Sequence, residues 1–232
     1  MSKIVVVGGG ASVNIGIKKG LWDKVKGMDI MTCNNAILHL PYAPKYAVWL
    51  DATEKDPTVT EKILNTECIR VTQQLHDQRD DDKVIRFEVC RNPDNLVNGL
   101  KHNPPVLYAG KRMFTGVFGI TLSLYMGYET IYLLGFDWGG YVKSKKDNVE
   151  WWGATKDFKG TDINIYKKGD KAREDVAEHH DCFKGMANII NVSPKSLVPS
   201  FPKISYDEFF RRIDNNVACC HDKQKGVVYG TV

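Results

Sequence analysis

The first dozen residues, MSKIVVVGGGAS, constrain the fold of this chain more than any other segment. An apolar run, Ile4–Val7, leads directly into Gly8, Gly9 and Gly10, and Ser12 follows. Such a short, unbroken apolar run is typical of a strand in a parallel sheet that is covered on both faces. Glycine adopts positive φ at little cost and has no side chain to keep a ligand away from the backbone. The segment therefore predicts an α/β domain with a site for a nucleotide-like ligand.

The spacing of these glycines narrows the choice of ligand. A dinucleotide-binding fingerprint, G-x-G-x-x-G, would begin at Gly8 and Gly10, but Val13 stands where the third glycine is needed. The residues after Gly16 do not complete a phosphate-binding P-loop either. A tight strand-to-helix turn without any ligand stays open as an alternative. Three successive glycines cost more backbone entropy than a plain turn requires, which favours the ligand.

Composition and cysteine usage point to an ordinary globular protein. The 232 residues are 43% hydrophobic and 26% charged, and no apolar run reaches the roughly 20 residues that span a bilayer. We therefore expect a cytoplasmic protein without a transmembrane segment. The six cysteines form no C-x-x-C pair. Two clusters, His179–Cys182 and Cys219–Asp222, contain zinc-type ligands, but neighbouring residues rarely face one metal, so no metal site is expected.

Strand-like and helix-like patterns alternate along the chain. Strands are expected at Ile4–Val7, Asp29–Cys33, Tyr46–Leu50, Cys68–Val71, Val84–Val89, Glu129–Leu134 and Asn188–Val192. Helices are expected at Val13–Val25, Pro57–Leu64, Thr115–Tyr125, Lys171–Lys184 and Ser205–Ile213, and a loop at Arg91–Gly110. This order predicts an α/β fold, a Rossmann-like and mostly parallel sheet with helices on both faces. We expect one nucleotide-binding domain over 1–218, with a lid-like insertion at 141–168 and a mobile tail at 219–232.

Small and polar residues follow the predicted strands. In parallel sheets, ligands bind beyond the carboxyl ends of the strands, so these residues can converge on one crevice. They are Gly8–Ser12, Asn34, Asp51, Gly135–Asp137 and Ser193. Each of them is also a common turn or helix-capping residue, and the ligand crevice is favoured by the set rather than by any member.

Four segments, in this order, carry a resemblance: VVVGGGAS, DIMTCNN, MFTGVFGITLSLYMGYETIYLLGFDW and INVSPKSLV. The set resembles the bacterial sialyltransferases that use CMP-sialic acid, and it is similar to the related flagellin-glycosylation proteins and the archaeal pterin pyrophosphokinases. The resemblance implies a Rossmann-like domain that holds CMP. The nucleotide-binding residues that it implies are Gly8, Gly9, Gly10, Ala11, Ser12, Asn34, Thr115, Gly116, Ser193 and Ser196. Asp51 and Asp137 join this set as strand-end carboxylates.

The resemblance also implies the chemistry, an inverting and metal-independent transfer of a sugar from a phosphate to a hydroxyl group. In the family a histidine accepts the acceptor proton and two tyrosines assist the leaving group. In this sequence His179 and His180 are the candidates for the base, and Tyr141 and Tyr166 for the tyrosines. No cofactor is expected beyond the nucleotide-sugar donor. No strand ends in D-x-D, which agrees with chemistry that needs no metal.

Two other functions stay open at this point. A pterin-type diphosphokinase would use ATP and Mg²⁺, which Asp51 and Asp137 could hold. A non-catalytic protein would bind a nucleotide, or a nucleic acid through the basic runs at 143–146 and 167–173, which otherwise form a solvated surface. The sequence leaves the acceptor unidentified and self-association undecided.

Overall fold

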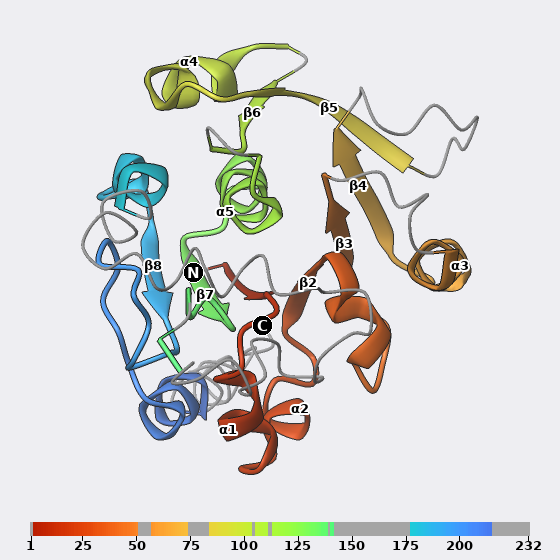
Figure 1. Cartoon of the computed structure of the whole chain (residues 1–232), viewed down its shortest axis with the longest axis vertical. Helices are drawn as coiled ribbons and strands as arrows, with labels where there is room; N and C mark the ends of the chain where they lie inside the picture. The colour runs from red at the N-terminus through yellow and green to blue at the C-terminus, as the bar shows by residue number, and fades with distance from the viewer. Residues whose placement is uncertain are drawn as a thin grey trace, which may run out of the picture.

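The computed structural model describes residues 2–50, 57–73, 84–103, 105–110, 113–138, 140–141 and 177–214, with backbone alone for 57–60. The described strands form one 8-stranded sheet in the order β6-β5-β4-β3-β2-β1-β7-β8, and every neighbouring pair is parallel (Figure 1). The strands are β1 Lys3–Val7, β2 Asp29–Cys33, β3 Tyr46–Trp49, β4 Ile69–Gln73, β5 Val84–Cys90, β6 Val106–Tyr108, β7 Thr130–Leu134 and β8 Asn188–Asn191. The α/β fold with a parallel sheet is therefore confirmed.

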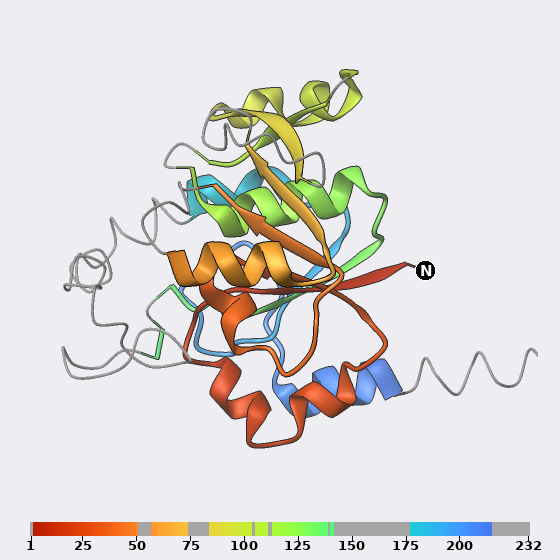
Figure 2. The same ribbon diagram turned by 90° about the vertical axis from the view of Figure 1, so that its right-hand side faces the viewer.

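Helices cover both faces of this sheet. They are α1 Val13–Ile17, α2 Leu21–Lys24, α3 Pro57–Asn65, α4 Leu96–Lys101 and α5 Thr115–Tyr125, with 3₁₀ turns η1 Asn34–His39, η3 Pro93–Asn95 and η4 Asp181–Phe183. Residues 177–180 and 206–214 are also helical. Figure 2 shows α5 on one side of the strands, with α1, α2 and the helix at 206–214 on the other.

The two layers of core follow from the alternation of side chains along the strands. In β1, Ile4 and Val6 belong to the core that contains Val117, Phe118 and other residues of α5. Val5 and Val7 belong to the opposite core, with side chains of α1, α2 and the helix at 206–214. Because both faces are covered, β1 is apolar and buried from Ile4 to Val7, as the sequence predicts.

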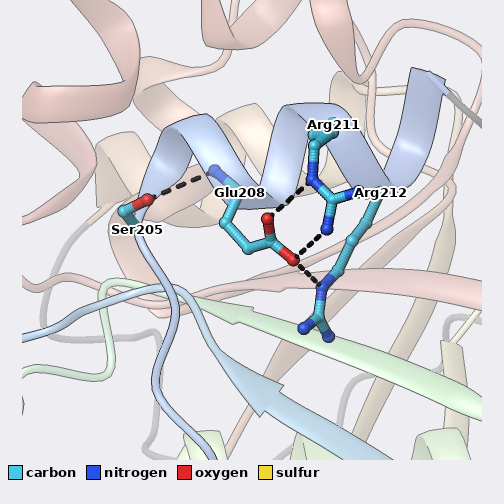
Figure 3. A network of polar contacts seen from close by, with 4 residues as sticks. All are labelled: Ser205, Glu208, Arg211 and Arg212. Atoms are coloured by element: carbon cyan, nitrogen blue, oxygen red, sulfur yellow. Dashed lines mark hydrogen bonds and ion pairs between the residues drawn. The ribbon is translucent and has the colours of Figure 1, made fainter.

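Polar contacts fix the helix at 206–214 at its start and on its surface (Figure 3). The Ser205 Oγ accepts a hydrogen bond from the backbone N–H of Glu208, which is the N-terminal half of a capping box. The Glu208 carboxylate accepts hydrogen bonds from Arg211 and Arg212, which lower its pKa to about 2. Two ion pairs, Lys19–Asp207 and Lys24–Asp214, join this helix to the turn after α1 and to α2.

Two expectations from the sequence are wrong in detail. The helix at Val13–Val25 is two short helices, because Gly20 adopts a left-handed conformation (φ 77°) and ends the first of them. The loop at Arg91–Gly110 contains η3, α4 and the edge strand β6. Among the described residues, none of the helices has the length and apolar character of a membrane span.

Candidate functional site

The carboxyl ends of four neighbouring strands lie along one edge of the sheet. There β1, β2, β7 and β8 are neighbours in the sheet order β2-β1-β7-β8. The segments that follow these strands are Gly8–Ser12, Asn34, Gly135–Asp137 and Ser193. The structure therefore brings these sequence-predicted residues to one edge, as the topology of a parallel sheet requires.

The glycine loops after β1 and β7 pack backbone against backbone. The N–H of Gly8 donates to the carbonyl of Leu134 (2.8 Å), and the N–H of Gly10 donates to that of Gly135 (2.8 Å). A side chain on Gly10 would bring its Cβ to 2.5 Å from the Gly135 carbonyl oxygen. Gly135 has φ 72°, a conformation that favours glycine. At least part of the glycine signal thus reflects this close approach, while Gly9, Gly10 and Ala11 stay half-buried.

A buried carboxylate joins three of the strand ends. The Asp137 side chain accepts hydrogen bonds from the Ser12 N–H (2.7 Å), the Ser12 Oγ (2.5 Å) and the Ser193 Oγ (2.7 Å). Asp137 and both serines are buried. Burial raises the pKa of Asp137, while the bonds from Ser12 and Ser193 act in the opposite direction. Ser196 is buried as well, and its Oγ donates to the carbonyl of Phe136 (2.6 Å).

The N-terminus of α5 opens at the same edge. The Thr115 Oγ1 donates to the Asn34 Oδ1 (3.0 Å), which links the start of this helix to the end of β2. The helix has no side-chain cap from Phe114, its N-cap residue. A Cβ on Gly116 would lie 2.8 Å from the ring of Phe136, so glycine at this position lets the ring cover the first turn. First-turn N–H groups of a helix are natural donors to a phosphate.

Strained backbone gathers around this helix start. Among the described residues, those other than glycine with positive φ are Asn34 (49°), Met113 (58°) and Trp138 (47°). Asn34 follows β2, Met113 precedes α5 and Trp138 follows β7, so all three lie at the carboxyl edge. Such conformations cost about 1–3 kcal/mol each and cluster at ligand-binding sites. Met113 and Trp138 could not be found from the sequence, because left-handed geometry at a bulky residue has no local sequence pattern.

The two candidate histidines lie in the core beside this edge. His179 is 3% exposed, and its ring packs edge-on against Phe114 with centroids 4.9 Å apart. His180 is fully buried between Trp138 (5.8 Å) and Phe201 (5.7 Å). Phe114 and Trp138 are in edge-on contact with each other (4.7 Å). The histidines thus contact the aromatic residues that flank α5 and β7, and both imidazoles are almost completely buried.

Tyr141 lies close to the buried carboxylate. Burial raises the pKa of Tyr141 above the usual value, an interaction with Ser193 lowers it, and the charge of Asp137 raises it. The Lys195 Nζ lies 5.6 Å from the centroid of the Tyr141 ring. A side chain on Gly140 would bring its Cβ to 1.7 Å from the Lys195 carbonyl oxygen, so the segments after β7 and β8 are in tight contact.

Several predicted features lie outside the described residues. They are Asp51, Tyr166, the remainder of the lid-like insertion at 142–168, the run at 167–173 and the tail at 219–232. Within the described part of the chain, no group of three or more His, Cys, Asp or Glu side chains is arranged to hold a metal ion.

The sequence matches no protein-family model and no curated protein. Among solved structures, the chain is similar to the sialyltransferase CstII from Campylobacter jejuni in complex with cytidine-5'-monophosphate. The two are 16% identical, with a TM-score of 0.48 over 88% of this chain and 85% of that chain. A structure of the same enzyme with the substrate analogue CMP-3FNeuAc is 16% identical, with a TM-score of 0.45 over 88% of this chain and 86% of the other.

Proposed function

We propose that the carboxyl edge binds a nucleotide-activated sugar, with a CMP-sugar favoured, and that the protein transfers the sugar to a hydroxyl acceptor. The observation that carries this proposal is the backbone around the start of α5. Strained residues from β2, β7 and the α5 entry surround an uncapped helix N-terminus. The choice of CMP rests on the resemblance of the sequence motifs.

Electrostatics favours one orientation of the nucleotide. Asp137 is a buried carboxylate at the β1 and β7 ends, and no ion pair of a described lysine or arginine neutralises it. A phosphate in direct contact with it would be repelled. The N–H groups at the start of α5 attract a phosphate, and Asn34 and Thr115 offer polar groups beside them. We therefore assign the phosphate to the part of the site beside the first turn of α5, and the nucleoside to the part beside Gly8–Ser12.

The chemistry requires a base for the acceptor hydroxyl and donors for the departing phosphate. We assign the base to His179 or His180, and donation to the leaving group to Tyr141, with Tyr166 as the second candidate. The imidazoles lie among Phe114, Trp138 and Phe201, which exclude water from their surroundings. Exclusion of water protects an activated sugar from hydrolysis. Direct displacement at the sugar carbon gives inversion, and the helix N-terminus takes the place that a metal would otherwise fill at the phosphate.

A nucleotide titration tests this function. We expect CMP to raise the melting temperature and to bind in calorimetry, with UMP, GDP and ATP weaker and with the same CMP affinity in EDTA as in Mg²⁺. The diphosphokinase alternative predicts the reverse, tight binding of ATP that is lost on chelation. Absence of CMP binding at millimolar concentration would remove the CMP-sugar proposal. Hydrolysis or transfer of a CMP-sugar donor, followed by CMP release, tests the catalytic part.

A further inference from the structure

The strongest polar cluster of the described structure surrounds Asp137. Its two carboxylate oxygens receive three hydrogen bonds, at 2.5–2.7 Å, from two loops that follow different strands. Ser12 and Asp137 are 125 positions apart in the sequence, and Asp137 and Ser193 are 56 apart. The backbone of Asp137 extends the link, because its carbonyl accepts from the N–H of Gly140 (3.0 Å) and of Leu197 (3.0 Å).

We propose that Asp137 is a positioning residue, which holds the Gly8–Ser12 loop against the loop after β8 in the shape that binds the nucleotide. This inference rests on the proposed nucleotide site. The sequence predicts that Asp137 contacts the nucleotide directly. Its two carboxylate oxygens instead accept hydrogen bonds from Ser12 and Ser193. The side chain therefore binds the two loops.

The position favours a negatively charged acceptor. Every partner of the side chain donates to it, namely one N–H and two hydroxyl groups. An ionised carboxylate satisfies all of them with charge-assisted hydrogen bonds. An amide in its place can still accept from the Ser12 N–H, and its own N–H groups can donate to the two hydroxyls. All of these hydrogen bonds are then neutral and about half as strong.

The helix at 206–214 also packs beside this cluster. Its Tyr206 is 2% exposed, and the Tyr206 ring lies directly against Gly16 of α1. Burial raises the pKa of Tyr206 well above the usual value, and the nearby charge of Asp137 raises it further. The cluster is therefore enclosed by α1 and the helix at 206–214, and this enclosure makes the hydrogen bonds to Asp137 strong.

The variant Asp137→Asn tests the proposal because it keeps the size and shape of the side chain. In the ligand-free protein, we expect the Ser12 amide to exchange its hydrogen about tenfold faster, since a weaker neutral hydrogen bond replaces its charge-assisted one. The Val5 amide in β1 is the internal reference, and the exchange rates of the two amides are compared. We expect the CMP dissociation constant to rise by about 10–100-fold.

The matched control is Asp29→Asn at the other edge of the sheet. Asp29 also accepts side-chain hydrogen bonds, from Lys45 (2.7 Å) and Tyr128, but it lies at the amino end of β2. We expect the control to leave both the Ser12 exchange rate and the CMP affinity unchanged. Ser12→Ala is a milder variant of the cluster, which serves if Asp137→Asn does not fold. Together, Ser12→Ala and Asp137→Asn should weaken CMP binding by less than the product of their separate effects.

The two readouts separate the inference from the function on which it rests. An unchanged Ser12 exchange rate in Asp137→Asn would overturn the positioning role, whatever the protein binds. Faster exchange with an unchanged CMP affinity would show that the loop does not shape the site, which also overturns it. Weaker CMP binding without faster exchange would assign Asp137 to direct contact. If the parent protein binds no CMP, the CMP proposal fails while the exchange experiment still decides whether Asp137 holds the loop.

Discussion

Gly16 in α1 faces the ring of Tyr206 from the helix at 206–214. A Cβ at Gly16 would lie 2.2 Å from the nearest ring carbon, and the buried Tyr206 cannot move away without disturbing the core. Gly16→Ala should therefore lower the free energy of unfolding by about 1–3 kcal/mol, the usual cost of overpacking. Urea unfolding of both proteins measures the difference.

The sign of this effect should reverse when the ring is removed. In a Tyr206→Ala background every ring atom close to Gly16 is gone, and alanine at position 16 is the better helix former by about 0.5–1 kcal/mol. Gly16→Ala should then stabilise the protein relative to Tyr206→Ala alone. A cost of equal size in both backgrounds would mean that the ring contact is not the cause.

His179 and His180 are alternative candidates for the base, because only one of them can take the acceptor proton in a single transfer step. Glutamine fills much of the volume of a buried imidazole and removes its basic nitrogen. We expect one of the variants His179→Gln and His180→Gln to lower turnover by about 10²–10⁴-fold, with nearly unchanged CMP affinity. The acidic limb of the pH–rate profile should disappear in that variant.

The other histidine variant is the control for the volume change. Its urea midpoint reports the cost of replacing a buried ring, and its turnover should stay near that of the parent. Turnover close to the parent's in both variants would exclude both histidines as the base.

At the scale of elements, the sequence predicts the buried strands and α5 well and misses α4 and β6. Apolar runs such as Ile4–Val7 mark strands covered on both faces, and the structure places them in the centre of the sheet. The segment Arg91–Gly110 looks like a loop because Gly99 and the prolines interrupt it. In the structure Gly99 is required, because a Cβ there would lie 2.3 Å from the Val106 carbonyl and keep α4 away from β6.

The candidate site was predictable only in its location. Strand ends follow from the alternation of patterns, so the common edge of Ser12, Asn34 and Ser193 could be expected. The pairing of Ser12 with Asp137 could not, because it joins residues 125 positions apart through side chains that fit many turns. The burial of His179 and His180 was also missed, since the aromatic residues around them come from distant segments.

At the scale of the whole molecule, stability should be uneven across the sheet. In the centre, β1 pairs with β2 and β7, and Val5 and Val6 are fully buried between two cores. Towards one end, β5 leaves Ile85 47% exposed, and the edge strand β6 is the short segment Val106–Tyr108. In β5 one residue, Val84, is buried, and β6 pairs with β5 alone, although its Leu107 and Tyr108 are buried. A partial opening of this end therefore needs less free energy than global unfolding.

Native-state hydrogen exchange tests this difference. We expect the hydrogen-bonded amides of β5 and β6 to exchange at least about tenfold faster than those of β1, a difference of roughly 1.4 kcal/mol in opening free energy. Low concentrations of urea should accelerate β5 and β6 less steeply than β1, because a partial opening exposes less surface than global unfolding. The amides of β7 serve as the control, because this strand, like β5, lies next to an edge strand but has all five residues buried, and they should follow β1. If the amides of β1 and β5 share one rate and one urea dependence, the sheet opens as a single unit and the expected gradient is absent.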